Sequence, residues 1–300
     1  MAKTFGENER RICSLFIPGS SFNYHGLSYT IKFADKPVCS KGEPKTDIFI
    51  RTETNDSLRK IVDFKISYKK DNADFIENKT SAERAEQLFG SNWTEIICKS
   101  TQALQNKFEQ RPIIYKNKFG RTEAGSITLG WKFELLRVPS GNLSGKMILT
   151  HQQKRGVYSG ENLVGDKRNA TVLGMTIPDS GIAEYIFEEI VPASTCQDVI
   201  DNMQTIDEFL EEYPNIYYAC KALNYRTFKR KYDGNRPLAV YIEWLANNGK
   251  LDYEIQFNTP LKQGGDYAYG CLKNAMDKLG IETTDDLNVN NVADSIKIHK

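Results

Sequence analysis

The sequence predicts a mixed α and β (α+β) fold: a central sheet with a β-hairpin flanked by helices, and a helix-rich C-terminal portion. Segments with apolar residues at every second position occur in the first 70 residues and again between about residues 113 and 177, which is typical of half-buried strands. Capping-box patterns precede helical apolar periodicity around residues 80 and 205. Apolar residues make up 40% of the chain, enough for a sizeable core.

The strands of the first part are expected over residues 27–33, 46–53 and 58–68, and the last two would form a hairpin around a turn at 54–57. No helix is expected before Leu27. Helices are expected from the Thr80–Glu83 capping box to a cap at Gly90, and from Asn92 to a point before Pro112.

Strands are expected to return at residues 126–135 and 146–150, and helices to dominate after residue 178. A further capping box begins at Thr205. The Asn248-Gly249 turn predicts one more hairpin, although residues 240–245 are equally compatible with a helix.

Composition excludes several classes of protein. The 300 residues carry a formal net charge of +1, which excludes a strongly basic nucleic-acid-binding tail but allows separate basic patches. There is no N-terminal signal-like apolar core, and no run reaches the roughly 18 apolar residues of a membrane span. A cytoplasmic protein without a membrane partner is therefore expected.

Metal-binding residue types are unevenly represented. Six scattered cysteines form no Cys-x-x-Cys pattern, and there are only three histidines, so zinc clusters and redox pairs are not expected. If the protein is an enzyme, its acids, bases and ligands are expected to be mostly carboxylates and lysines.

The hairpin carries the main candidate site. Asp47 begins its first strand, and Asp63 and Lys65 lie two residues apart on its second, so the last two share one face. Asp47 would lie opposite Asp63 if the hairpin centre were residue 55, and opposite Lys65 if it were residue 56. A whole-number centre places Ile48 and Ile50 on one face with Val62, Phe64 and Ile66. It puts Asp47 on the face of Asp63 and Lys65, where Phe49 and Ile61 also fall. An ordinary solvated charged face is the alternative.

These residue types have a specific chemistry. Two carboxylates about 4 Å apart repel by about 1 kcal/mol in water and by several times more in a cleft. Mg²⁺ relieves this repulsion, because it commonly binds one or two carboxylates together with water and substrate phosphate. A nearby lysine can hold a phosphate oxygen or the attacking water, which together with the metal favours phosphodiester hydrolysis.

The segment from Pro44 to Asp47, followed by Asp63-Phe64-Lys65, resembles the PD-(D/E)xK nuclease superfamily, and type II restriction endonucleases in particular. The resemblance covers roughly residues 42–70 and the helices that follow. It implies that Asp47 and Asp63 bind Mg²⁺, with Mn²⁺ as a substitute, and that Lys65 assists the attacking water. Many members also bind the metal with a glutamate on an earlier helix. Without a predicted helix that position stays unfilled, and the weak candidates are Glu7, Glu9 and Glu43.

Two further stretches have the composition of DNA-contacting segments, because Gln, Asn and Arg pair with base edges, Lys and Arg neutralise phosphates, and aromatic residues stack. One runs from His151 to Asn169 and the other from Lys221 to Arg236, where only Asp233 opposes the basic residues. The alternatives are a polar surface loop for the first stretch and a solvated helix end before the Asp233-Gly234 turn for the second. The candidate DNA contacts are Lys69, Lys70, Gln152, Gln153, Lys154, Arg155, Lys167, Arg168, Asn169, Arg226, Lys229, Arg230 and Lys231.

The sequence therefore predicts a Mg²⁺-dependent endodeoxyribonuclease, as a type II restriction enzyme acting on duplex DNA as a homodimer. A structure-specific repair, recombination or phage nuclease is one alternative, and a non-catalytic DNA-binding or protein-interaction module is another. The expected domains are a nuclease core at 1–178 with a β-rich DNA-contacting insert, and a helix-rich domain at 179–300 that binds DNA or dimerises.

Overall fold

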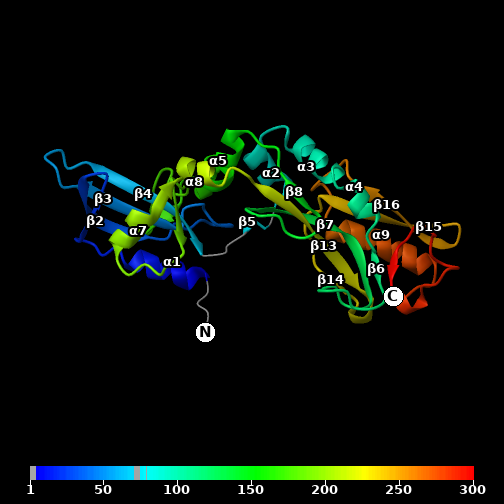
Figure 1. The fold of residues 1–300 in the computed structure, drawn as a ribbon. Helices are drawn as coiled ribbons and strands as arrows, with labels where there is room; N and C mark the ends of the chain where they lie inside the picture. Colours follow the sequence, from blue (N-terminus) through cyan, green and yellow to red (C-terminus); the bar gives the residue numbers. More distant parts are fainter. Residues whose placement is uncertain (1–4, 71–74, 79) are drawn as a thin grey trace. The chain divides into compact units, whose positions relative to one another are not determined.

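The computed structural model describes residues 5–70, 75–78 and 80–300 (Figure 1). It divides the chain into two compact units, each made of two stretches. The first unit is Met1–Asp74 with Leu149–Asn215, and the second is Phe75–Ile148 with Ile216–Lys300. The chain passes between the units three times, and the boundary expected near residue 178 falls inside the first unit.

The first unit is built around a six-stranded sheet with the order β1-β2-β3-β4-β11-β12. All neighbouring strands are antiparallel except β4 and β11, which are parallel. Its elements are α1 (Phe5–Ser14), β1 (Ser21–Tyr24), β2 (Leu27–Asp35), β3 (Ile48–Thr54), β4 (Ile61–Lys70), α5 (His151–Ser159), α6 (Gly165–Arg168), β9 (Thr171–Val172), β10 (Met175–Thr176), β11 (Tyr185–Glu189), α7 (Cys196–Asn202), β12 (Met203–Thr205) and α8 (Ile206–Glu212).

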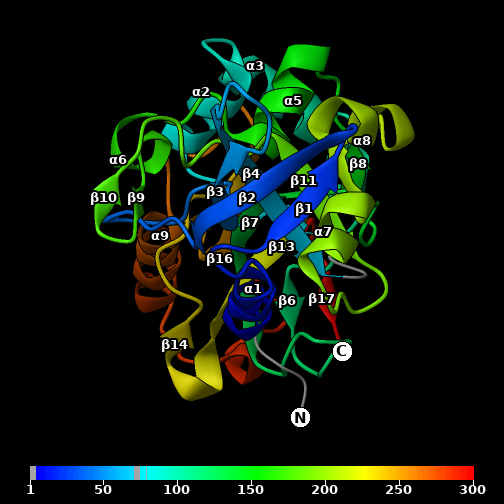
Figure 2. The same ribbon diagram turned by 90° about the vertical axis from the view of Figure 1, so that its left-hand side faces the viewer.

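Helices α1 and α7 cover one face of this sheet. Ile12 of α1, Phe16 two residues after this helix, and Val199 of α7 belong to one buried cluster with apolar residues of β2, β3, β4 and β11. On the other face, Phe49 packs with Val172 from the β9–β10 hairpin. Figure 2 shows α1 and α7 beside β1 and β2, with β9 and β10 on another side of the unit.

The turn of the β3–β4 hairpin is wider than the sequence predicted. The Asp56 carboxylate accepts hydrogen bonds from the backbone N–H groups of Leu58 and Arg59, both at 3.1 Å, and from the Thr54 hydroxyl at 2.7 Å. This closed loop delays the start of β4 to Ile61, three residues later than expected.

The second unit is built around the long strand β7 (Ser126–Leu136), which is buried along almost its whole length. Its main strand order is β14-β13-β7-β15-β16. Its elements are β5 (Phe75–Glu77), α2 (Ala82–Phe89), α3 (Trp93–Gln102), α4 (Gln105–Glu109), β6 (Ile114–Tyr115), β7, β8 (Ser144–Lys146), β13 (Tyr217–Arg226), the 3-10 turn η1 (Thr227–Lys229), β14 (Lys231–Tyr232), β15 (Val240–Asn247), β16 (Lys250–Gln256), α9 (Gly265–Lys278), the 3-10 turn η2 (Thr284–Asp286) and β17 (Ile298–His299).

The mixed α and β class is confirmed, but the helix-rich C-terminal portion is wrong. Strands β13, β15 and β16 all follow residue 178, and β13 and β15 pair with β7 of the same unit. The hairpin between β15 and β16 is confirmed. Its turn has positive φ at both Asn248 (49°) and Gly249 (75°), as a type I′ turn requires.

Among the described residues, three helices were not expected from the sequence. They are α1, and α5 and α6, which occupy a segment interpreted as a loop. Helix α5 begins with a capping box between Thr150 and Gln153 and ends at Gly160 in a left-handed conformation. Within the described residues no helix has the length and apolar character needed to span a membrane.

Candidate functional site

The register of the β3–β4 hairpin differs from both registers considered in the sequence. Arg51 lies opposite Asp63, which puts the hairpin centre at residue 57. Because this centre is a whole number, Asp47 shares a face with Asp63 and Lys65, as the apolar pattern predicted. Asp47 nevertheless lies opposite neither of them: it faces Ser67, whose hydroxyl donates to its carboxylate at 3.3 Å.

This register separates Asp63 from Asp47. Asp63 is four residues from Ser67 along β4, or about 13 Å at roughly 3.3 Å per residue. Two oxygens that share a Mg²⁺ must lie within about 4 Å of each other, since each is about 2.1 Å from the ion. The Asp63 carboxylate instead accepts two hydrogen bonds from the Arg51 guanidinium, both at 2.8 Å. The expected cross-strand pairing is therefore wrong.

Lys65 also has another partner. Its Nζ lies 2.7 Å from Oε1 of Glu184, the residue just before β11. The Lys65 side chain is 12% exposed, so its amine is held in this ion pair rather than directed into open solvent.

Helix α1 brings a carboxylate to the end of the sheet where β3 begins. Glu9 is 8% exposed and forms an ion pair with Lys36, the residue that follows β2. Because Asp35 pairs with Phe49 in antiparallel strands, the end of β2 and the start of β3 lie at the same end of the sheet, next to Asp47. The expectation of no helix before residue 27 is wrong, and α1 is an earlier helix that carries a glutamate.

Asp47 is held by one of its two carboxylate oxygens. Its Oδ2 accepts hydrogen bonds from the Tyr68 backbone N–H at 2.8 Å and from the Ser67 hydroxyl. Its Oδ1 makes no hydrogen bond within the described part of the chain. Burial raises the pKa of Asp47 and the charge of Glu9 adds to this rise, while the charge of Lys69 lowers the pKa. The site therefore contains a desolvated carboxylate with one free oxygen.

Lys69 is the lysine whose charge acts on Asp47 and lowers the pKa of its carboxyl. It lies two residues after Ser67 on β4, so the two side chains share a face. Its amine makes no ion pair or hydrogen bond with any residue in the described ranges. The sequence marked Lys69 only as a DNA contact, because the turn was placed too early. The observed register places Ser67 opposite Asp47, with Lys69 two residues further along the same face of β4.

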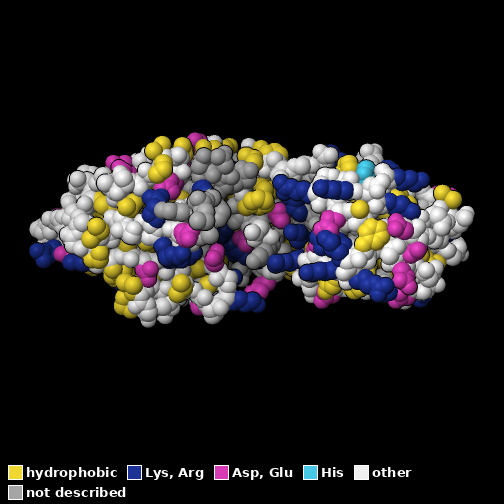
Figure 3. Space-filling model, turned by 90° about the horizontal axis from the view of Figure 1, so that it is seen from below, with side chains coloured by type: hydrophobic (Ala, Val, Ile, Leu, Met, Phe, Trp, Pro, Cys, Tyr) yellow, Lys and Arg dark blue, Asp and Glu magenta, His cyan; other side chains and the backbone are white. Residues whose placement is uncertain are grey.

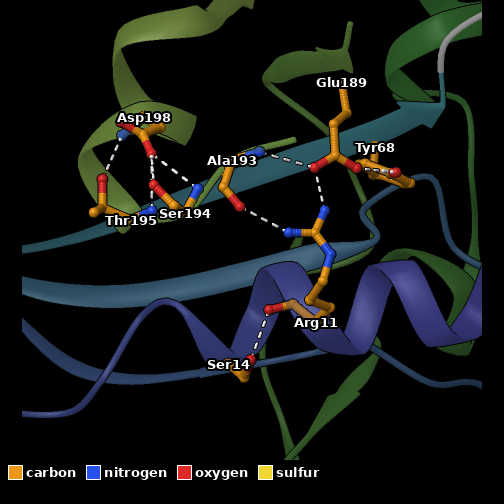
Figure 4. Close-up of polar contacts among 8 residues, drawn as sticks. All are labelled: Arg11, Ser14, Tyr68, Glu189, Ala193, Ser194, Thr195 and Asp198. Atoms are coloured by element: carbon orange, nitrogen blue, oxygen red, sulfur yellow. Dashed lines mark hydrogen bonds and ion pairs between the residues drawn. The ribbon is translucent and has the colours of Figure 1, made fainter. Parts of the chain in front are cut away.

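A buried polar network fixes α1 against the sheet near this site (Figure 4). Arg11 donates to the Ala193 carbonyl at 2.8 Å and forms an ion pair with Glu189 at the end of β11. The Tyr68 hydroxyl donates to the other oxygen of Glu189 at 2.6 Å. Burial opposes ionisation of Glu189, but the bonds from Tyr68 and Arg11 outweigh it and lower the pKa of Glu189. The network sets the position of Glu9, which lies two residues before Arg11.

The candidate DNA contacts of the first unit are only partly free. Arg155 forms ion pairs with Asp207 and with Glu161, the latter at 3.2 Å. Arg168 pairs with Asp179 at 2.6 Å. Both arginines are thus balanced by carboxylates. The other candidates of this unit are Lys69, Lys70, Gln152, Gln153, Lys154, Lys167 and Asn169, of which Gln152 to Lys154 lie in the first turn of α5.

The basic segment of the second unit is more strongly opposed than the sequence predicted. Its candidates are Arg226, Lys229, Arg230 and Lys231. Arg226 forms an ion pair with Asp233, Lys229 with Glu123, and Arg230 with Glu282. The expectation that only Asp233 opposes them is wrong, because the two glutamates come from distant parts of the sequence. On the face drawn in Figure 3, basic and acidic side chains are interleaved rather than separated.

The residues at the end of the first unit's sheet fit a hard divalent cation. Among the described residues, no three or more His, Cys, Asp or Glu side chains gather closely enough to hold a metal ion. A cage made entirely of side chains is therefore not present there. Mg²⁺ commonly uses one or two carboxylates and takes its other oxygens from water and substrate phosphate. Glu9 and the free oxygen of Asp47 fit that pattern.

Comparisons of this chain with protein-family models, with curated proteins and with solved structures found no match. The function of the site therefore has to be inferred from its own residues and their geometry.

Proposed function

We propose that the first unit is a Mg²⁺-dependent endodeoxyribonuclease that hydrolyses phosphodiester bonds of duplex DNA. The observation that carries the proposal is the meeting, at one end of the sheet, of two carboxylates and a lysine that has no partner among the described residues. These residues are Glu9 on α1, Asp47 just before β3 and Lys69 on β4.

Each residue has a distinct role. Asp47 and Glu9 would hold the cation through carboxylate oxygens, in place of the ion pair that Glu9 makes with Lys36. Bound Mg²⁺ supplies Lewis acidity to the phosphate and lowers the pKa of water. Lys69 orients the attacking water and stabilises the negative charge that develops on the phosphoryl oxygens. Ser67 and the Tyr68 backbone N–H keep Asp47 in place.

The electrostatics support a reactive site over a merely solvated charged face. A desolvated aspartate destabilises the folded state unless a cation or a donor compensates it. Asp47 keeps one oxygen without a donor in the described structure, and burial raises the pKa of this group. Ionisable groups perturbed in this way are typical of functional sites.

The arrangement is similar to the PD-(D/E)xK pattern in its aspartate, its lysine and its helical glutamate. It departs from that pattern at Ser67, which stands where the pattern has a second acid. Within this proposal, sequence-specific cleavage by a homodimer, as in type II restriction enzymes, is the finer hypothesis. Structure-specific cleavage and DNA binding without cleavage are its rivals.

The test is to incubate the full chain with a supercoiled plasmid, a phage genome and a branched duplex, in Mg²⁺, in Mn²⁺ and in EDTA. We expect metal-dependent cleavage that Asp47→Asn abolishes and that Asp294→Asn, a change at a 94% exposed carboxylate, leaves intact. Discrete fragments of the phage genome would support the restriction hypothesis, and cleavage confined to the branched duplex would support its first rival. No cleavage and no Mn²⁺ binding would contradict the proposal.

A further inference from the structure

The second unit contains a cavity that no part of the proposed nuclease site uses. Its volume is about 210 Å³. Its wall comes from three segments: the residues before α2, the strand β7, and the loop between β14 and β15. The polar residues of the wall are Asn78, Thr80, Ser81, Lys132, Asn235 and Arg236.

The charge of this wall is positive. Lys132 and Arg236 are its charged side chains, and no carboxylate is among its lining residues. Lys132 lies 3.3 Å from Glu134, which lies outside the wall. The Arg236 guanidinium has no ion pair or hydrogen bond with any residue that the structure describes. An arginine without a partner at a concave site is suited to bind an oxyanion through paired N–H groups.

Hydrogen-bond donors supplement the two cations. Asn235 Oδ1 accepts from the Asp266 backbone N–H at 3.3 Å, so its amide nitrogen remains available as a donor. Ser81 caps α2 by accepting from the Arg84 N–H at 3.1 Å, which leaves its hydroxyl proton free to donate. The Thr80 hydroxyl is buried and has no hydrogen-bond partner among the described residues.

The loop that carries Arg236 is held firmly against the start of α9. The Arg236 carbonyl accepts from the Gly265 N–H at 3.1 Å, and the Leu238 N–H donates to the Gln263 carbonyl at 2.9 Å. Pro237 forms a β-bridge with Gly264. Since this backbone is already ordered, binding there would require little loss of conformational freedom.

We infer that this cavity binds a phosphate group. The volume is below the roughly 300–1,000 Å³ of typical small-molecule sites, so it suits a compact oxyanion and little more. The phosphate could be free, or part of a nucleic-acid backbone. Both sources present the same oxygens to Arg236 and Lys132. The inference stands apart from the proposed nuclease activity, whose residues all belong to the first unit.

The test is a calorimetric titration of the full chain in EDTA with two probes, inorganic phosphate and a short duplex oligonucleotide. Arg236→Gln is the main variant, because Arg236 is exposed and its loss should not affect folding. Lys132→Gln is the second variant. Lys278→Gln is the matched control: it removes one exposed charge at the far end of α9, about 20 Å from Gly265 along a helix of this length.

We expect at least tenfold weaker binding of one probe in Arg236→Gln and in Lys132→Gln, and unchanged binding in Lys278→Gln. A loss confined to inorganic phosphate identifies a free anion as the ligand, and a loss confined to the oligonucleotide identifies a backbone phosphate. Binding of neither probe to the wild-type chain would overturn the inference. So would equal binding in wild type and Arg236→Gln.

Discussion

Single substitutions of Lys65 and Lys69 distinguish the observed register of the β3–β4 hairpin from the two registers considered in the sequence. Lys65 and Lys69 lie on the same face of β4, each two residues from Ser67, and they differ in their partners. Lys65 is held by Glu184 at 2.7 Å, whereas Lys69 is unpaired in the described structure and its charge lowers the pKa of Asp47.

The expected magnitudes follow from these contacts. Lys69→Met removes a charge that would stabilise the transition state, and removal of one such donor costs about 10²–10³-fold in rate. Lys65→Met breaks an ion pair whose glutamate is 46% exposed, which is worth about 0–1 kcal/mol of stability, and the rate should stay within about threefold of wild type. Initial rates of plasmid nicking at saturating Mg²⁺, with circular dichroism to verify folding, measure both effects.

Metal binding gives a second readout that does not depend on cleavage. Glu9→Gln should weaken Mn²⁺ binding at least tenfold in a calorimetric titration. Asp63→Asn should leave it unchanged, because Asp63 is about 13 Å from the position opposite Asp47. If Asp63→Asn or Lys65→Met eliminated metal binding or cleavage while Glu9→Gln and Lys69→Met did not, the register-based assignment of the site would be refuted.

Three further changes test the energetics. Asp47→Asn removes a buried charge and should raise the unfolding midpoint at pH 7, by roughly 2–4 °C for each kcal/mol gained. The gain should vanish as the pH falls through the raised pKa of Asp47, because the wild-type carboxyl is then neutral as well. An unchanged or lower midpoint at pH 7 would contradict this. Gly130→Ala would put a Cβ 2.6 Å from a backbone oxygen of β15, and it should lower the free energy of unfolding of the second unit, measured by calorimetry, by more than about 3 kcal/mol. Gly141→Ala, also at positive φ but in open space, should cost about 1–2 kcal/mol. Equal effects of the two changes would refute the close packing of β7 on β15. Arg11→Met leaves the 9% exposed Glu189 carboxylate without its cation and should destabilise the first unit by about 2–3 kcal/mol in urea unfolding. The double variant that also carries Glu189→Gln should recover part of this loss. If the free-energy changes of the two single variants simply added up in the double variant, the two residues would not interact.

The local features of the fold were readable from the sequence, because short-range patterns determine them. The β3–β4 hairpin, the Thr205 capping box and the Asn248-Gly249 turn each depend on a few adjacent residues. The cap of α2 was one residue off, since Ser81 rather than Thr80 accepts the capping hydrogen bond.

The site itself depends on features that local patterns do not determine. The register follows from a side-chain-stabilised turn at Asp56, which periodicity alone cannot reveal. The role of Glu9 depends on α1, a short polar helix that is stabilised by packing through Ile12 and by the bonds of Arg11. The pairing of β4 with β11 joins residues more than a hundred positions apart, beyond the reach of any local signal.

The division of the chain into two interrupted units has a consequence for synthesis on the ribosome. When β4 has emerged, one of its edges stays without a partner until β11 is made, after the whole of Phe75–Ile148. That intervening stretch contains β7, whose neighbours β13 and β15 are made later still. The nascent chain therefore carries two incomplete sheets at once, each with an open edge of the kind that promotes aggregation. Neither unit can be obtained by cutting the gene at a single position.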